Sequence, residues 1–149
     1  MTMDFDKILV PTDGSEYTKA AVRKAMELAE LSKGKITALY VMDQTIFTNV
    51  PMDTAVMNVY HTLEKEGNNA LKYVEELGKE TGINVDIKLA EGIPIRVILE
   101  LSKEYDIIVM GTLGRTGMSK LLMGSVAERV VRASKCPVMV VRSPEADKQ

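Results

Sequence analysis

Three glycines and one serine near the C-terminal end of the chain have a spacing that suits phosphate binding. Gly111 and Gly114 are separated by two residues, and after nine more residues come Gly124 and Ser125. An apolar run at 106–110 predicts a buried strand before this group, and residues 126–132 predict a helix after it. Glycine lets a backbone approach an anion closely, and the free N–H groups of a helix start point toward it. The pattern therefore predicts nucleotide binding.

The same residues also have a structural interpretation that needs no ligand. Glycines are common in strand–helix turns. Ser125 and Glu128 match the capping box Ser-x-x-Glu, which satisfies N–H groups at a helix start by itself. Two features favour a ligand: Gly124 stands directly before the helix, and Arg115 and Lys120 can neutralise phosphate charge. Both interpretations stay open, because a capping serine can also present its hydroxyl to a phosphate.

The standard nucleotide signatures do not occur. No P-loop sequence is found. The dinucleotide-binding pattern G-x-G-x-x-G is also missing, because the first predicted strand–helix turn contains only one glycine, Gly14. Asp13, in that turn, is either a carboxylate favoured by the helix dipole or an acceptor for ribose, adenine or a divalent cation. Val41 ends the second predicted strand, where it fits the core and can also line an apolar slot for a base. His61 stands alone in a helical stretch and is interpreted as a surface or half-buried residue.

The elements that must position these residues alternate between strand and helix. The apolar runs predict strands at 7–11, 36–42, 85–89, 106–110 and 137–142, and the helical patterns lie at about 16–32, 54–79, 92–104 and 126–132. Residues 43–53 show no periodicity and predict a loop, and the mixed third strand fits a partly wet edge. This alternation predicts one α/β domain over 1–149, a parallel sheet with helices on both faces. Ligands of such sheets bind beyond the carboxyl ends of the strands, where the winding reverses, and strands one and four are the expected neighbours there.

Composition excludes several classes of function. The 149 residues are 46% hydrophobic and 27% charged, as in an ordinary globular protein, and the net charge of −2 argues against nucleic-acid binding through a basic surface. No apolar stretch is long enough for a membrane span, and no signal peptide is recognised. A single cysteine suits a reducing cytoplasm, and one histidine without a Cys/His cluster argues against zinc. We therefore expect a cytoplasmic protein that binds neither nucleic acid nor membrane.

Four segments together resemble one known family. They are residues 8–15, 91–94, 106–112 and 136–141, and the group Gly111, Gly114, Gly124 and Ser125 matches the family's ATP motif G-2x-G-9x-G-[ST] in full. Over essentially its whole length the chain resembles the universal stress protein family, in the subgroup that binds ATP.

The resemblance implies a fold, an assembly and a binding site. The implied fold is a three-layer α/β sandwich with strand order 3-2-1-4-5, and the implied assembly is a homodimer formed largely through the fifth strand. Adenine is expected near Pro11, Thr12, Asp13 and Val41, and the ribose and phosphates along Met110, Gly111, Gly114, Arg115, Gly124, Ser125 and Val126. Mg or Mn is the divalent cation expected with the triphosphate. Ala127 and Leu113 stand where relatives often carry polar side chains, which removes two contacts.

The function favoured by these residues is a nucleotide-dependent switch in stress response or signalling, with an unidentified signalling partner. We predict no catalytic residue and no metal ligand set, because no general base, metal cluster or water-positioning residue accompanies the glycine loop. One alternative is slow ATP hydrolysis stimulated by a partner, with Asp13 helping to polarise water. The other is a module that binds AMP or cyclic AMP, or no nucleotide at all.

Overall fold

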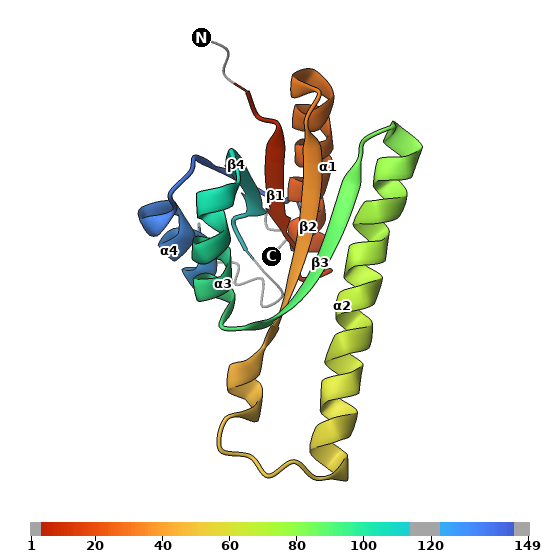
Figure 1. The fold of residues 1–149 in the computed structure, drawn as a ribbon, viewed down its shortest axis with the longest axis vertical. Coiled ribbons are helices and arrows are strands. Elements are labelled where there is room, and N and C mark those ends of the chain that lie inside the picture. The colour runs from red at the N-terminus through yellow and green to blue at the C-terminus, as the bar shows by residue number, and fades with distance from the viewer. Residues whose placement is uncertain (1–3, 114–122, 145–149) are drawn as a thin grey trace.

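The structure is a computed structural model that describes residues 4–113 and 123–144 (Figure 1). Five strands form one sheet in which every neighbouring pair is parallel. The strands are β1 (Lys7–Pro11), β2 (Lys35–Asp43), β3 (Val85–Gly92), β4 (Ile107–Gly111) and β5 (Val138–Val141). Their order is β3-β2-β1-β4-β5, which confirms the order 3-2-1-4-5 and the edge position of the third strand.

Helices lie on both faces of the sheet, so the molecule has three layers. The helices are α1 (Glu16–Ser32), α2 (Thr54–Thr81), α3 (Pro94–Leu101) and α4 (Ser125–Ala133), with short 3₁₀ helices η1 (Gln44–Phe47) and η2 (Ser102–Glu104). Side chains alternate between the faces of a strand. In β1, Ile8 and Val10 pack under α1 and α2, whereas Leu9 packs under α3 and α4. Each face of the sheet therefore has its own apolar core, and β1 and β4 are neighbours at the point where the helices change sides.

Two elements, β3 and α2, extend beyond the ranges predicted by sequence. β3 continues to Gly92 because its pairing with β2 continues to the pair Asp43 and Gly92. α2 runs without interruption to Thr81, through the Gly67 position that predicted a bend. A Cβ atom at Gly67 would lie 2.8 Å from Leu89 Cδ1, so glycine is needed for the close approach of α2 to the sheet.

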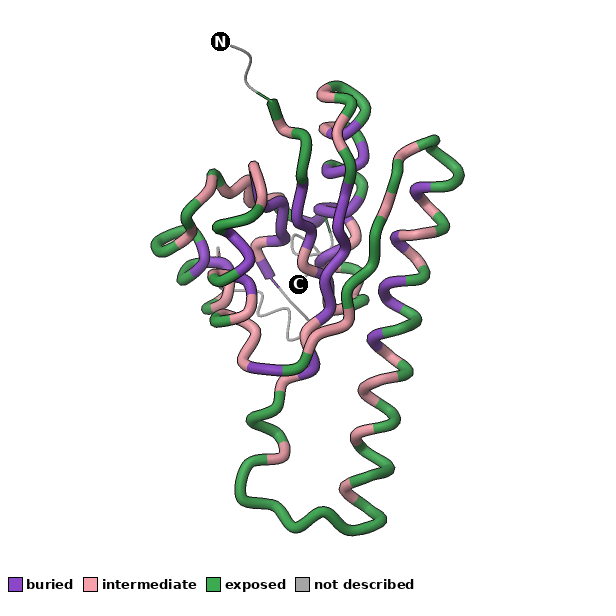
Figure 2. The backbone as a smooth tube through the Cα atoms, viewed as in Figure 1, coloured by how far each residue is buried: buried purple, intermediate pink, exposed green. Residues whose placement is uncertain are grey.

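The connection from β2 to α2 projects beyond the sheet. Residues 44–60, which we call the arm, comprise η1, the link to α2 and the first turns of α2. Asp43 accepts hydrogen bonds from the backbone N–H and the hydroxyl of Thr45, at 3.0 and 2.6 Å, and so begins η1. Figure 2 shows the arm as mostly exposed backbone at one end of the molecule. The expectation of a structureless loop at 43–53 was therefore wrong in part.

Candidate functional site

The carboxyl end of β1 holds a tight turn against the middle of the sheet. Pro11 is partly buried, and the N–H of Thr12 donates to the carbonyl of Leu39 at 2.9 Å. The Thr12 hydroxyl accepts from the N–H of Gly14 at 3.1 Å. Gly14 has a φ of 81° and would bring a Cβ to 3.0 Å from Ala70, so both its conformation and its surroundings require glycine. The turn is thus fixed by its own residues.

Asp13 holds the start of α1. Its Oδ1 atom accepts a hydrogen bond from the N–H of Ser15 at 2.9 Å and another from the hydroxyl of Thr18 at 3.2 Å. This confirms the interpretation of Asp13 as a carboxylate at a helix start. The hydroxyl of Ser15, at the N-cap position, is buried and makes no hydrogen bond with any part of the chain that the structure describes. Sequence reasoning passed over Ser15, although a serine at a helix N-cap is a recognisable signal.

The carboxyl end of β4 lies directly beneath the first turn of α1. Met110 and Gly111 are both buried. A Cβ atom at Gly111 would lie 2.9 Å from the carbonyl oxygen of Tyr17 and 3.2 Å from that of Leu113, and neither backbone atom can move easily. The N–H of Thr112 then donates to Val141 at 3.1 Å. Gly111 is therefore required for packing, whatever ligand binds near it.

The start of α4 has no side-chain cap. The N-cap residue is Gly124, whose N–H donates to the carbonyl of Thr112 at 2.6 Å, and Ser125 is the first residue of the helix. The predicted capping box is therefore wrong, because the helix begins at Ser125 itself, one residue too early for Ser125 to be its N-cap. Glu128 instead pairs with Arg132 at 2.9 Å. Within residues 4–113 and 123–144, nothing accepts a hydrogen bond from the backbone N–H groups of residues 125–127.

Several of the predicted site residues lie together at the carboxyl ends of the strands. Val41 and Val126 are partly buried and pack against the apolar core that contains Met110. The turn at Thr12 and Asp13 follows β1, the neighbour of β4. Gly114 and Arg115 lie outside the described residues.

The remaining features considered from the sequence are His61, metal clusters and membrane-spanning helices. His61 is largely exposed on α2 and lies 3.7 Å from the Glu64 carboxylate. The described residues contain no group of three His, Cys, Asp or Glu side chains able to hold a metal ion. None of the helices in the same residues has the length and apolarity needed to cross a membrane.

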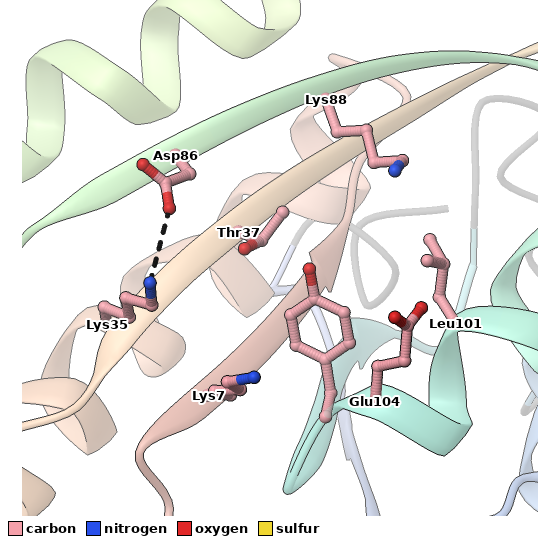
Figure 3. A pocket seen from close by; sticks show the side chains of 8 residues that line it. Lys7, Lys35, Thr37, Asp86, Lys88, Leu101 and Glu104 are labelled. Carbon is pink, nitrogen blue, oxygen red and sulfur yellow. Dashed lines mark ion pairs between the residues drawn. The ribbon is translucent and has the colours of Figure 1, made fainter.

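Two hollows in the surface contain none of the predicted site residues. The first, about 200 Å³, lies at the amino ends of β1 and β2, where the side chains shown in Figure 3 surround it. In this hollow Lys35 pairs with Asp86 at 3.7 Å. The second, about 460 Å³, lies between η1, β3 and α3. Sequence patterns did not indicate either hollow, because their residues come from several elements that only the fold brings together.

The comparisons with known proteins show the family of the chain. The model of the universal stress protein family matches residues 4–142. The chain belongs to that family. It is 37% identical over 145 residues to universal stress protein MJ0531 of Methanocaldococcus jannaschii, covering 96% of this chain and 85% of the relative.

Solved structures of the family share the fold. The structure of MJ0577, also from Methanocaldococcus jannaschii, superposes with a TM-score of 0.80 at 29% identity, covering 92% of this chain and 95% of that one. A universal stress protein in complex with cyclic AMP has a TM-score of 0.69 at 24% identity, covering 93% of this chain and 98% of that one. One from Arabidopsis thaliana with AMP bound has a TM-score of 0.67 at 20% identity, covering 93% of each. Some proteins of this fold thus bind adenine nucleotides.

Proposed function

We propose that the chain binds ATP beyond the carboxyl ends of β1 and β4 and acts in the cytoplasm as a nucleotide-dependent switch. The observation that carries this proposal is the uncapped start of α4. Its first N–H groups have no acceptor among the described residues, and Gly124 supplies no side chain to cover them. These N–H groups lie at the positive end of the helix dipole, which is where proteins commonly bind phosphate.

The phosphates are assigned to Gly111, Gly114, Arg115, Gly124, Ser125 and Val126. The sequence separation Gly-x-x-Gly followed by Gly-Ser supports this choice, and Arg115 would supply a compensating positive charge. Glu128, the one carboxylate in the first turn of α4, is held by Arg132. A triphosphate at Ser125 therefore meets backbone donors, while the nearest helical carboxylate is already neutralised.

The adenosine is assigned to the residues at the carboxyl ends of β1 and β2, beside the proposed phosphate site. Val41 contributes an apolar side chain that suits a base, and it packs against the core between the sheet and α3 and α4. Pro11 ends the neighbouring strand β1, and Thr12 and Asp13 follow it. Asp13 is the one carboxylate of the set, so it is the group we assign to ribose or adenine hydrogen bonding.

A divalent cation, Mg or Mn, is proposed to bind together with the triphosphate. The described residues offer no three-ligand cluster, so phosphate oxygens would supply most of its coordination. Among the described residues, we also assign no general base beside the phosphates, which supports ATP binding without rapid hydrolysis. Slow hydrolysis stimulated by a partner is the alternative that a single-turnover assay separates from pure binding.

Calorimetric titration of the purified protein tests this proposal. ATP with Mg, AMP and cyclic AMP are titrated separately, the last two because structures of the same fold contain them. We expect saturable heat for ATP and weaker binding of the two monophosphates, which lack the groups assigned to α4. No heat with ATP, together with no nucleotide released on denaturation, would contradict the proposal.

A homodimer through β5 accompanies this proposal. β5 is an edge strand and its four residues are only partly buried. The carbonyls of Pro137 and Val141 accept hydrogen bonds from Ile108 of β4 and from Thr112 just after it, so the N–H of Val140 points away from β4. Val140→Pro removes that outward donor and leaves the β4 ladder intact. We expect this variant to sediment as a monomer, while an unchanged mass would contradict pairing through β5.

A further inference from the structure

The arm carries most of the large apolar side chains that the chain exposes. Of the eight exposed large hydrophobic residues among those described, five lie within residues 46–59. They are Ile46, Val50, Met52, Met57 and Val59. Ile46 is 50% exposed and Met52 is 61% exposed. Single exposed hydrophobic residues are ordinary, but a group on one projecting segment indicates an interaction surface.

The inner side of the arm contacts the rest of the molecule, and these contacts fix the positions of the exposed side chains on its outer side. The rings of Phe47 and Tyr60 lie 5.9 Å apart and join η1 to α2. The Tyr60 hydroxyl donates to the carboxylate of Glu91 on β3, which ties the arm to the sheet. The first turns of α2 thus have an inner side that packs on the molecule and an outer side that exposes Met57 and Val59.

The charge of the arm restricts what can cover it. Residues 44–60 contain a single charged side chain, Asp53, although charged residues are 27% of the whole chain. That carboxylate accepts a hydrogen bond from the N–H of Val56 at 2.9 Å and so is engaged at the start of α2. Membrane-surface helices use Lys and Arg to bind anionic lipids, and the arm has neither. Binding of a partner through complementary charges is likewise disfavoured, because Asp53 is the single charged residue of the arm.

We propose that the arm packs against the same arm of a second copy of this chain. A twofold contact places each surface against itself, so charged groups near the axis would repel their own copies. An apolar arm without repeated charges avoids this repulsion. The arm follows β2 and precedes α2, whereas β5 lies at the far edge of the sheet, so this contact is distinct from the proposed β5 dimer.

The contact is expected to be weak by itself. Stable dimers use about 20–30 residues from each partner, and the arm has fewer. Self-association through the arm should therefore depend on protein concentration, and together with β5 pairing it would build assemblies larger than a dimer.

Sedimentation velocity over a concentration series up to about 1 mM tests the proposal. The Val140→Pro background is used so that β5 pairing does not contribute, and no nucleotide is added, so the result does not depend on ATP binding. Val59→Glu places a charge on the arm. Leu31→Glu is the matched control, because Leu31 is 84% exposed near the end of α1, outside the arm. Circular dichroism verifies that both variants are folded.

We expect Val59→Glu to weaken self-association about tenfold or more, and Leu31→Glu to leave it unchanged. In a Cys136→Ser background, Val59→Cys should also cross-link to its own copy with a short bismaleimide, and Leu31→Cys should not. Equal association of both Glu variants, or no self-association over the whole series, would overturn the proposal. So would arm-dependent binding to vesicles containing phosphatidylserine, which would assign the arm to a membrane.

Discussion

The starts of α2 and α4 are built in opposite ways. α2 begins after Asp53, whose carboxylate accepts a hydrogen bond from the N–H of Val56 at 2.9 Å. α4 begins after Gly124, which has no side chain to offer. An aspartate cap stabilises a helix by satisfying one of its free donors, and glycine does not.

The difference corresponds to where each helix starts. α2 starts in the arm, away from the carboxyl ends of β1 and β4, and the chain supplies its own anion there. α4 starts beside Thr112, directly after β4, and the described residues supply none. α1 and α3 also begin without a side-chain cap, so a missing cap is not by itself a sign of a ligand. For α2 and α4, we infer that the capped start has a structural role and that the open one receives phosphate.

Among the variants considered, we expect Gly111→Ala, at the carboxyl end of β4, to have the largest effect on stability. The added Cβ would lie 2.9 Å from the Tyr17 carbonyl oxygen, so α1 or β4 must shift. We expect a loss of about 1–3 kcal/mol in the free energy of unfolding, measured by urea denaturation. Gly124→Ala is the matched control, because its Cβ would come no closer than 3.4 Å to Thr112. Equal stability of the two variants would mean that Gly111 has no packing role.

Gly124→Asp converts the open start of α4 into a start like that of α2. The side chain has room, and its carboxylate would accept hydrogen bonds from the N–H groups assigned to phosphate. We expect ATP affinity to fall about tenfold or more by calorimetry, because the carboxylate both occupies the donors and repels the phosphates. The melting temperature should stay equal or rise slightly. Undiminished ATP affinity would remove α4 from the site.

Asp53→Ala removes the cap from α2. It should lower the free energy of unfolding by about 1 kcal/mol in urea denaturation, since the N–H of Val56 loses its acceptor. ATP affinity should not change, because α2 is not assigned to the nucleotide. Asp53→Asn serves as the control, because asparagine caps helices about as well as aspartate. A loss of ATP binding in Asp53→Ala would show that the two helix starts do not have separate roles.

The smallest effect concerns the other contact that holds the arm. The hydrogen bond from Tyr60 to Glu91 raises the pKa of the Tyr60 phenol above its ordinary value of 10.0, because the ionised form loses that bond. A raised pKa in the folded state means that the contribution of this group to stability is present below pH 10 and is lost as the pH rises through the folded value. Ultraviolet titration should show a smaller late-titrating signal in Tyr60→Phe than in the unaltered protein, because the Tyr60 phenol no longer contributes to it. An unchanged late phase in that variant would exclude this contact.

The strands could be predicted because they are short apolar runs separated by helical patterns, whereas the full strand order was implied only by the family resemblance. Leu9 and Ile108 lie in such runs and are fully buried. The end of β3 could not be predicted, since Glu91 is polar and its strand conformation depends on pairing with Met42 of β2. Residues 44–53 of the arm were predicted only as a loop, because their apolar residues follow no period, whereas the helix from Thr54 was predicted.

Sequence reasoning placed the candidate site residues at the carboxyl ends of β1 and β4, where the described ones of that set lie, but it missed local detail. The carboxyl ends of β1 and β4 could be identified from the alternation of elements, which decides where parallel strands end. The capping box failed because the carbonyl of Gly124 accepts the N–H of Glu128 at 3.0 Å, which makes Gly124 the N-cap, and the pattern of Ser125 and Glu128 does not indicate where the helix begins. The packing role of Gly111 also depends on a distant contact, with Tyr17.

The backbone amide signals of the two helix starts test the central claim most directly. In a ¹⁵N-labelled sample titrated with ATP and Mg, the amides of Ser125, Val126 and Ala127 should shift until binding saturates. The amide of Val56, which already donates to Asp53, should stay in place. Saturable ATP binding that leaves the amides of 125–127 unshifted would contradict the claim that the open start of α4 receives the phosphates.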